Sequence, residues 1–168
     1  LFPDEIAKAL GTERSLVSIY ESFRYIATAV VNIFFGALIS RFGTKKMIGF
    51  GFCFLIVSML IYANATRIVT FYVGGCFLGI GLAFTTTSMV GCVVRRWCKE
   101  HSGKIMGAVL AANGLGGAVA AQIVSPIIYE EGNPFGFRNA YKLVALILAV
   151  VGVVIMLVFR EKASNEPA

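Results

Sequence analysis

Long apolar segments alternate with short polar ones along this chain. Because an α-helix rises by about 1.5 Å per residue, about 20 helical residues cross a hydrocarbon core that is about 30 Å thick. Five apolar segments approach or exceed that length, and together they predict an all-α membrane protein with a helical bundle over residues 16–160. They lie at residues 16–40, 46–63, 68–94, 104–129 and 139–160.

The composition excludes a soluble globular protein. Of the 168 residues, 58% are hydrophobic and only 14% are charged, whereas soluble domains carry about 25% charged residues. A chain of this size cannot bury so much apolar surface in one core. The net charge of +6 does not indicate nucleic-acid binding, because the basic residues gather in short clusters beside the apolar segments. In such positions they report membrane topology.

Patterns of catalysis or metal binding are not evident. The four cysteines lack close metal-ligand spacing, and His101 follows Glu100 in a charged connection. An intramembrane enzyme would carry His, Asp or Glu side chains clustered at one depth. We therefore expect no enzyme, no metal site and no cofactor.

The basic clusters predict an orientation, since Lys and Arg concentrate on the cytoplasmic side of a membrane. One side collects nine: Arg41, Lys45, Lys46, Arg95, Arg96, Lys99, Lys104, Arg160 and Lys162. The other side collects five: Lys8, Arg14, Arg67, Arg138 and Lys142. We expect a multi-pass protein of the cell membrane with its amino terminus outside and its carboxyl terminus in the cytoplasm. Residues 1–15 would be an exterior segment and residues 161–168 a cytoplasmic tail.

The same charges give the depth of polar residues. Nine helical residues span about 13.5 Å, so a residue nine positions from a cytoplasmic charge lies near the bilayer centre. That count reaches Asn32 from Arg41, Thr86 from Arg95, and Asn113 from Lys104. In the other two helices it reaches apolar residues, Leu55 from Lys46 and Val151 from Arg160. We expect these two helices to face lipid at that level.

Polar residues also share one face of the first helix. Ser18, Glu21, Tyr25, Thr28 and Asn32 are spaced by three or four residues, and a polar face on a spanning helix must contact protein or water. Two interpretations remain open, because such side chains line a solute path in some bundles and hold helices together by hydrogen bonds in others. The first interpretation assigns a substrate path to Tyr25, Thr28, Asn32, Thr86 and Asn113.

Small residues recur along the fourth helix. Gly103, Gly107, Ala111, Gly114 and Ala118 are spaced by three or four residues, a stripe that permits close approach of another helix. Tight packing without motion is the more common role of such a stripe, and sliding against a neighbour is the alternative.

The first basic connection resembles a known motif. Residues 36–46 read Gly-Ala-Leu-Ile-Ser-Arg-Phe-Gly-Thr-Lys-Lys, similar to the G-x-L-x-D-R-x-G-R-K loop of the major facilitator superfamily, with Ser40 in place of the Asp. Trp97 and Cys98, followed by Gly103 and Gly107, resemble the entry to that family's fifth helix. Residues 136–141, Gly-Phe-Arg-Asn-Ala-Tyr, resemble the start of its sixth. Among subfamilies, the oxalate/formate antiporter and monocarboxylate transporter branch looks most similar.

The resemblance implies that the five helices correspond to helices two to six of a six-helix half. A first helix would precede the chain, and a carboxyl-terminal half would complete a secondary transporter for a small organic solute, with an organic anion as a candidate. The alternative is a non-transporting, receptor-like or assembly module with the same bundle. Conformational gating would involve Gly36, Arg41, Gly43, Lys45, Lys46, Gly103 and Gly107. Gly36 and Gly43 are expected to permit a tight turn, and the basic residues to contact carboxylates or helix ends in one state.

Overall fold

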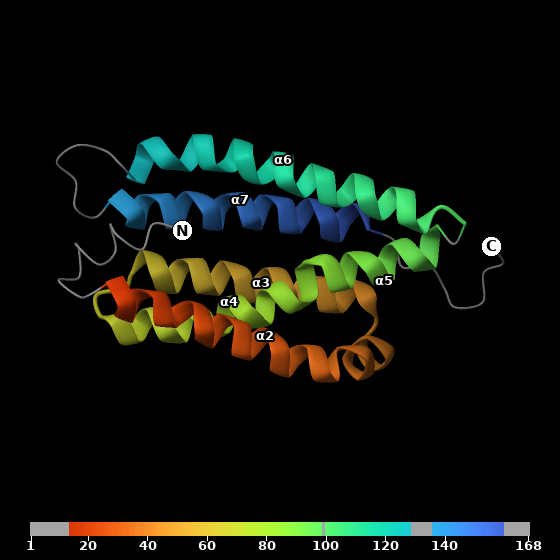
Figure 1. The fold of residues 1–168 in the computed structure, drawn as a ribbon, viewed down its shortest axis with the longest axis horizontal. Coiled ribbons are helices and arrows are strands. Elements are labelled where there is room, and N and C mark those ends of the chain that lie inside the picture. Colours follow the sequence, from red (N-terminus) through yellow and green to blue (C-terminus); the bar gives the residue numbers. More distant parts are fainter. Residues whose placement is uncertain (1–13, 99, 129–135, 160–168) are drawn as a thin grey trace.

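The computed structural model describes residues 14–98, 100–128 and 136–159. The expected cytoplasmic tail, and all but the last residues of the expected exterior segment, lie outside these ranges. Within them every regular element is a helix, as expected for an all-α protein (Figure 1). The helices are α2 (Arg14–Phe42), α3 (Thr44–Ala63), α4 (Ile68–Thr85), α5 (Thr87–Trp97), α6 (Ser102–Ile128) and α7 (Gly136–Val158).

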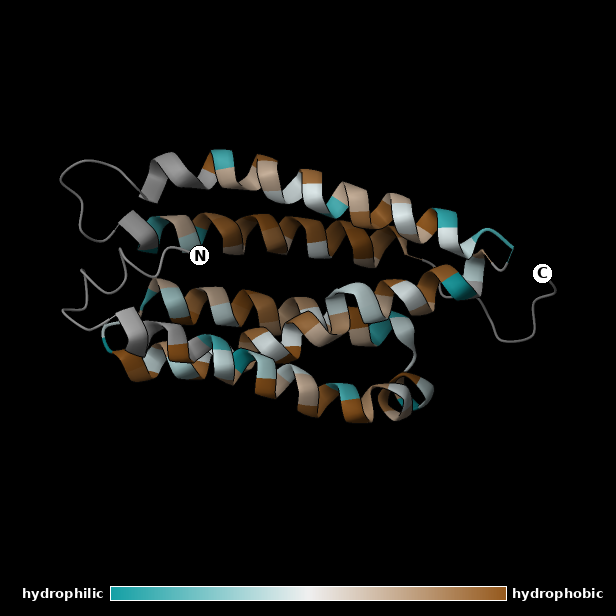
Figure 2. Cartoon of the chain, viewed as in Figure 1, coloured by the Kyte–Doolittle hydropathy of each residue, from teal (hydrophilic) through white to brown (hydrophobic). Residues whose placement is uncertain are grey.

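Five spans in the described ranges are long and apolar enough to cross a membrane, one for each apolar segment of the sequence. Four of them are single helices. The third, Ile68–Arg95, runs through α4 and into α5, so the expected single helix over residues 68–94 is interrupted at Thr86. In Figure 2, α7 is hydrophobic along most of its length, whereas α6 is paler and more mixed.

The tightest packing lies among α2, α3 and α4, and glycines of α4 make it possible. A Cβ atom on Gly79 would meet the backbone carbonyl oxygen of Arg24 in α2 and would lie 2.9 Å from the Cβ of Ala27. A Cβ on Gly74 would lie 2.5 Å from the Tyr62 ring of α3. On the same side of α4, the Ser58 hydroxyl donates a buried hydrogen bond of 2.8 Å to the carbonyl oxygen of Gly74. Helices with small residues at the interface approach closely and gain van der Waals contact.

The expectation that Leu55 faces lipid is wrong. Leu55 is only 6% exposed and packs on Gly81, whose added Cβ would lie 2.8 Å from the Leu55 side chain. Helix α3 lies between α4 and α7 and contacts both, so only one of its faces is open, the one that carries Phe50 and Val57. The corresponding expectation for Val151 on α7 agrees with the structure, where that side chain is 41% exposed.

The start of α7 is fixed to the turn between α3 and α4. The Arg138 guanidinium donates a hydrogen bond of 3.0 Å to the carbonyl oxygen of Ala65. The Tyr62 ring lies 5.1 Å from that of Tyr141 and 5.2 Å from that of Phe71, measured between centroids. Such aromatic pairs contribute about 0.5–1.5 kcal/mol beyond the burial of their area. This cluster joins α3, α4 and α7 at one end of the bundle.

Helix α6 lies at one side of the bundle (Figure 1), packed mainly on α7 and α5. Its side chains from Gly107 to Ile123 are exposed, apart from Val109. A Cβ at Gly103, Gly107 or Gly114 would meet nothing within 4 Å. The stripe of small residues on α6 is therefore not used for close packing within the described part of the chain.

Candidate functional site

The break between α4 and α5 is centred on Thr86. Its backbone is extended, with φ −98° and ψ −158°, between two helical residues that are also threonines. The hydroxyls of Thr85 and Thr86 donate hydrogen bonds of 2.9 and 2.7 Å to the carbonyl oxygens of Gly81 and Leu82, four residues earlier. Hydroxyls that bond backward in this way bend helices, and β-branched residues lose side-chain freedom in a helix. A run of threonines thus explains why the helix ends here.

A pocket of about 140 Å³ lies between this break and α6. It brings together two of the residues that the depth count placed at one level, Thr86 and Asn113. Both residues are exposed, so a bound solute can reach their polar groups. The pocket is lined by Thr85, Thr86, Thr87, Val90, Met106, Val109, Leu110 and Asn113. Four of the eight lining residues are polar and uncharged, which suits a small solute held by hydrogen bonds on an apolar support.

The three path residues of α2 do not line this pocket. The Thr28 hydroxyl lies 2.9 Å from the carbonyl oxygens of Arg24 and Gly79, so it donates to one of them or shares its proton between both. Thr28 thus serves the contact between α2 and α4, as the packing interpretation holds. Tyr25 and Asn32 are exposed, and α2 is not among the helices on which α6 mainly packs. For Asn32 and Asn113 both interpretations remain open.

Arg24, in the amino-terminal half of α2, contacts two neighbouring residues of the same helix. The Arg24 guanidinium carbon lies 4.5 Å from the centre of the Tyr25 ring, and a guanidinium nitrogen lies 3.7 Å from a carboxylate oxygen of Glu21. A cation over an aromatic face is stabilised by about 0.5–1 kcal/mol at exposed sites. These contacts hold Arg24 beside its own helix, which gives it a structural role in the described chain.

The turn between α2 and α3 depends on one glycine. Gly43 has φ 82° and ψ 156°, a conformation that side chains disfavour, and its N–H donates a hydrogen bond of 2.9 Å to the carbonyl oxygen of Ile39. Gly36 was expected to help form this turn, but it lies inside α2, and a Cβ there would meet nothing within 4 Å. The turn needs Gly43 and not Gly36.

The basic residues of the turn are open to contact. Arg41 and Lys46 are exposed, and Lys45 is half-buried. The Arg41 guanidinium carbon lies 5.7 Å from the centre of the Phe42 ring. Within the described residues neither lysine has a hydrogen-bond or ion-pair partner. Their gating role remains a prediction.

Several residues that shape the site region were missed from the sequence. Gly79, Gly81 and Gly74 set the spacing of α4 against its neighbours, and the Gly79-Ile80-Gly81 sequence was a signal that could have indicated this contact. Arg138 was used only in the charge count and in the motif of residues 136–141, yet it holds α7 to the turn at Ala65. Among the described residues no group of His, Cys, Asp or Glu could hold a metal ion.

Comparison of the sequence with known proteins identifies the family of this chain. A family model described as Major Facilitator Superfamily matches residues 1–168. The chain is 26% identical over 151 residues to the "Uncharacterized MFS-type transporter YcxA" of Bacillus subtilis (strain 168), with 87% of this chain and 35% of that protein covered. It is 30% identical over 149 residues to "Multidrug resistance protein 2" of the same organism, with 84% and 34% covered. The chain thus spans about a third of the length of these relatives. On the match across its whole length, the chain belongs to the major facilitator superfamily.

Proposed function

We propose that this chain is part of a secondary active transporter that moves a small organic solute by alternating access, and that the pocket at Thr86 and Asn113 forms part of the solute path. The single observation that carries this proposal is the meeting of an interrupted helix with an exposed asparagine in a mainly uncharged pocket. Transporter sites commonly lie near the bilayer midplane, where helices are discontinuous. The family match and the transporter names of both relatives support it.

The proposed solute is an organic anion, as the resemblance to the oxalate/formate antiporter and monocarboxylate branch implies, exchanged against a second solute. The break at Thr86 agrees with this, since the first backbone N–H groups of α5 have no acceptor within that helix. The start of a helix also favours negative charge. A pocket with hydroxyl and amide side chains and no carboxylate does not oppose an anion.

A second solute class follows from one relative. "Multidrug resistance protein 2" is 30% identical to this chain, and its name favours drug transport as the alternative. The two alternatives differ in how added unlabelled anion affects transport. Efflux of a preloaded organic anion from proteoliposomes, accelerated by unlabelled anion outside, indicates exchange. Export of a fluorescent apolar dye that small anions do not inhibit indicates the drug alternative.

The experiment that tests the proposed function uses the complete protein reconstituted in liposomes. Saturable flux of either solute class is expected. Absence of saturable flux in folded, correctly inserted protein would favour the receptor-like or assembly module. On this proposal the remaining parts of the transporter, a first helix and a carboxyl-terminal half, supply the rest of the cavity.

We also propose that the α2–α3 turn faces the cytoplasm, in the cell membrane. The structure brings this turn and the connection between α5 and α6 to the same end of the bundle (Figure 1), so the clusters around Lys46 and Lys104 reinforce each other. A membrane-impermeant thiol reagent should label Thr66→Cys, in the turn between α3 and α4, in intact cells. It should label Ser102→Cys only after permeabilisation, and the reverse pattern would overturn the orientation.

A further inference from the structure

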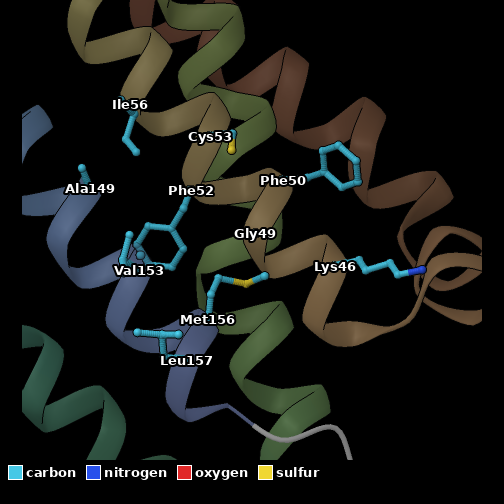
Figure 3. A pocket seen from close by; sticks show the side chains of 11 residues that line it. Lys46, Gly49, Phe50, Phe52, Cys53, Ile56, Ala149, Val153, Met156 and Leu157 are labelled. Carbon is cyan, nitrogen blue, oxygen red and sulfur yellow. The ribbon is translucent and has the colours of Figure 1, made fainter.

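Two apolar grooves flank α3 and start at the same basic end of the bundle. The larger, about 620 Å³, lies between α3 and α7 and is lined at one end by Lys46 (Figure 3). The smaller, about 340 Å³, lies between α2 and α3 and is also lined by Ile80 and Phe84 of α4; Phe42 lies at the same end, and all its lining residues are apolar. Phe50, which is 53% exposed, lines both grooves. The two grooves are thus neighbours on either side of one exposed ring.

The dimensions of the grooves match one leaflet of a bilayer. The lining residues of α3 in the larger groove run from Lys46 to Ile56, which is about 15 Å along the helix, or half of a hydrocarbon core about 30 Å thick. In the smaller groove they run from Met47 to Phe54, about 10 Å by the same rise. By the depth count from the basic residues, both grooves would begin near the membrane surface and end near the midplane, as an acyl chain does.

The positive charge at the basic end of the grooves favours an anionic lipid headgroup. Figure 3 shows Lys46 and Phe50 extending from α3 on the side away from α7. Lys46 is exposed, and among the described residues it has no hydrogen-bond or ion-pair partner. Lys45 and Arg41 add positive charge to the same turn. Basic residues beside grooves between helices attract anionic lipid headgroups.

We propose that one anionic phospholipid sits astride α3, with one acyl chain in each groove and its phosphate bound by Lys46. A molecule with a single negative headgroup and two chains fits two grooves that share one basic entrance. The lipid would cover the Phe50 ring and join α2, α3 and α7 on their outer side. This site is separate from the pocket at Thr86 and Asn113.

Cys53 supplies a reporter, because it lines the larger groove and is exposed. The complete protein, with Cys53 as its sole cysteine and labelled with a small fluorophore, is reconstituted in bilayers. Brominated phosphatidylglycerol or brominated phosphatidylcholine of the same chain length is then added, since bromine quenches fluorescence on contact. We expect half-maximal quenching at about fivefold lower mole fraction for phosphatidylglycerol, which corresponds to about 1 kcal/mol for one basic residue near anionic lipid.

Lys46→Gln should remove this preference without unfolding the protein, because the side chain is exposed. Lys104→Gln is the matched control, since it removes an exposed positive charge on the same membrane side outside the groove, and it should keep the fivefold preference. Equal quenching by both lipids in the unaltered protein would overturn the proposal. So would equal loss in both variants, which indicates general surface charge, or no quenching by either lipid, which indicates that protein covers the groove.

A second measurement needs no fluorophore. Native mass spectrometry of delipidated protein, mixed with equal amounts of the two unbrominated lipids, should retain phosphatidylglycerol about fivefold more than phosphatidylcholine. A Lys46→Gln protein should retain both equally. Retention of both lipids in equal amounts by the unaltered protein would contradict the site independently of the reporter.

Discussion

Adding one methyl group at Gly79 should loosen the contact between α2 and α4. A Cβ there would meet the carbonyl oxygen of Arg24 and would lie 2.9 Å from the Ala27 Cβ and 3.1 Å from the Thr28 hydroxyl. A backbone atom cannot rotate away as the tip of a side chain can, so the helices must separate. Overpacking of this kind costs about 1–3 kcal/mol.

Two further contributions set the net effect of Gly79→Ala. Separation weakens the hydrogen bond from Thr28 to the Gly79 carbonyl oxygen, and such bonds between membrane helices contribute about 0.6 kcal/mol on average. Alanine is better than glycine inside a helix by about 1 kcal/mol, which acts in the opposite direction. The expected net destabilisation lies between about 0.5 and 2.5 kcal/mol.

Gly36→Ala is the matched control for the same change. Gly36 lies inside α2, as Gly79 lies inside α4, but a Cβ on Gly36 would meet nothing within 4 Å. Only the gain in helix propensity remains, so Gly36→Ala should stabilise the protein by up to about 1 kcal/mol. Unfolding by dodecyl sulfate in mixed micelles, followed by circular dichroism, gives both values. If the two variants prove equally stable, the close contact at Gly79 is refuted.

Four other substitutions test the packing by the same unfolding measurement. Leu55→Ala should lower the free energy of unfolding by about 2–5 kcal/mol because Leu55 is buried. Val151→Ala, at an exposed position, should change it by no more than about 0.5 kcal/mol. Equal losses in the two variants would contradict the packing of Leu55 between α3 and α4. Gly43→Ala should lower the free energy of unfolding by about 1–3 kcal/mol because its φ of 82° and ψ of 156° disfavour a side chain, and an unchanged stability would show that the turn is relaxed. Arg138→Met should cost about 1.5–3 kcal/mol, the contribution of a hydrogen bond to a charged group, and no loss would show that this bond is dispensable.

The sequence was most informative about depth. Counting from the basic clusters placed Thr86 and Asn113 at one level, and the structure brings both into one pocket. Length and hydropathy likewise located the five spans. Both succeed because the bilayer imposes a thickness that every spanning helix must match.

The rotation of each helix about its axis could not be obtained in the same way. Leu55 was expected to face lipid because it is apolar at the depth where other helices carry polar residues. It is buried because α3 packs on α4 at Gly81. An apolar side chain suits lipid and protein equally well, so hydropathy does not tell the two apart. The break at Thr86 was missed for a related reason, since the run around it remains apolar overall while its hydroxyls bond to the preceding turn.

The central claim is that a solute passes through the pocket at Thr86 and Asn113, and uptake per folded molecule tests it most directly. The complete transporter carrying Asn113→Leu is compared with Gln122→Leu, an exposed residue of the same helix that does not line the pocket. Loss of a hydrogen bond worth about 1–3 kcal/mol predicts that Asn113→Leu lowers normalised uptake about fivefold or more, while Gln122→Leu leaves it near the unaltered level. If Asn113→Leu instead reduces only the amount of folded protein and leaves uptake per folded molecule unchanged, Asn113 serves helix packing and the proposed path is contradicted.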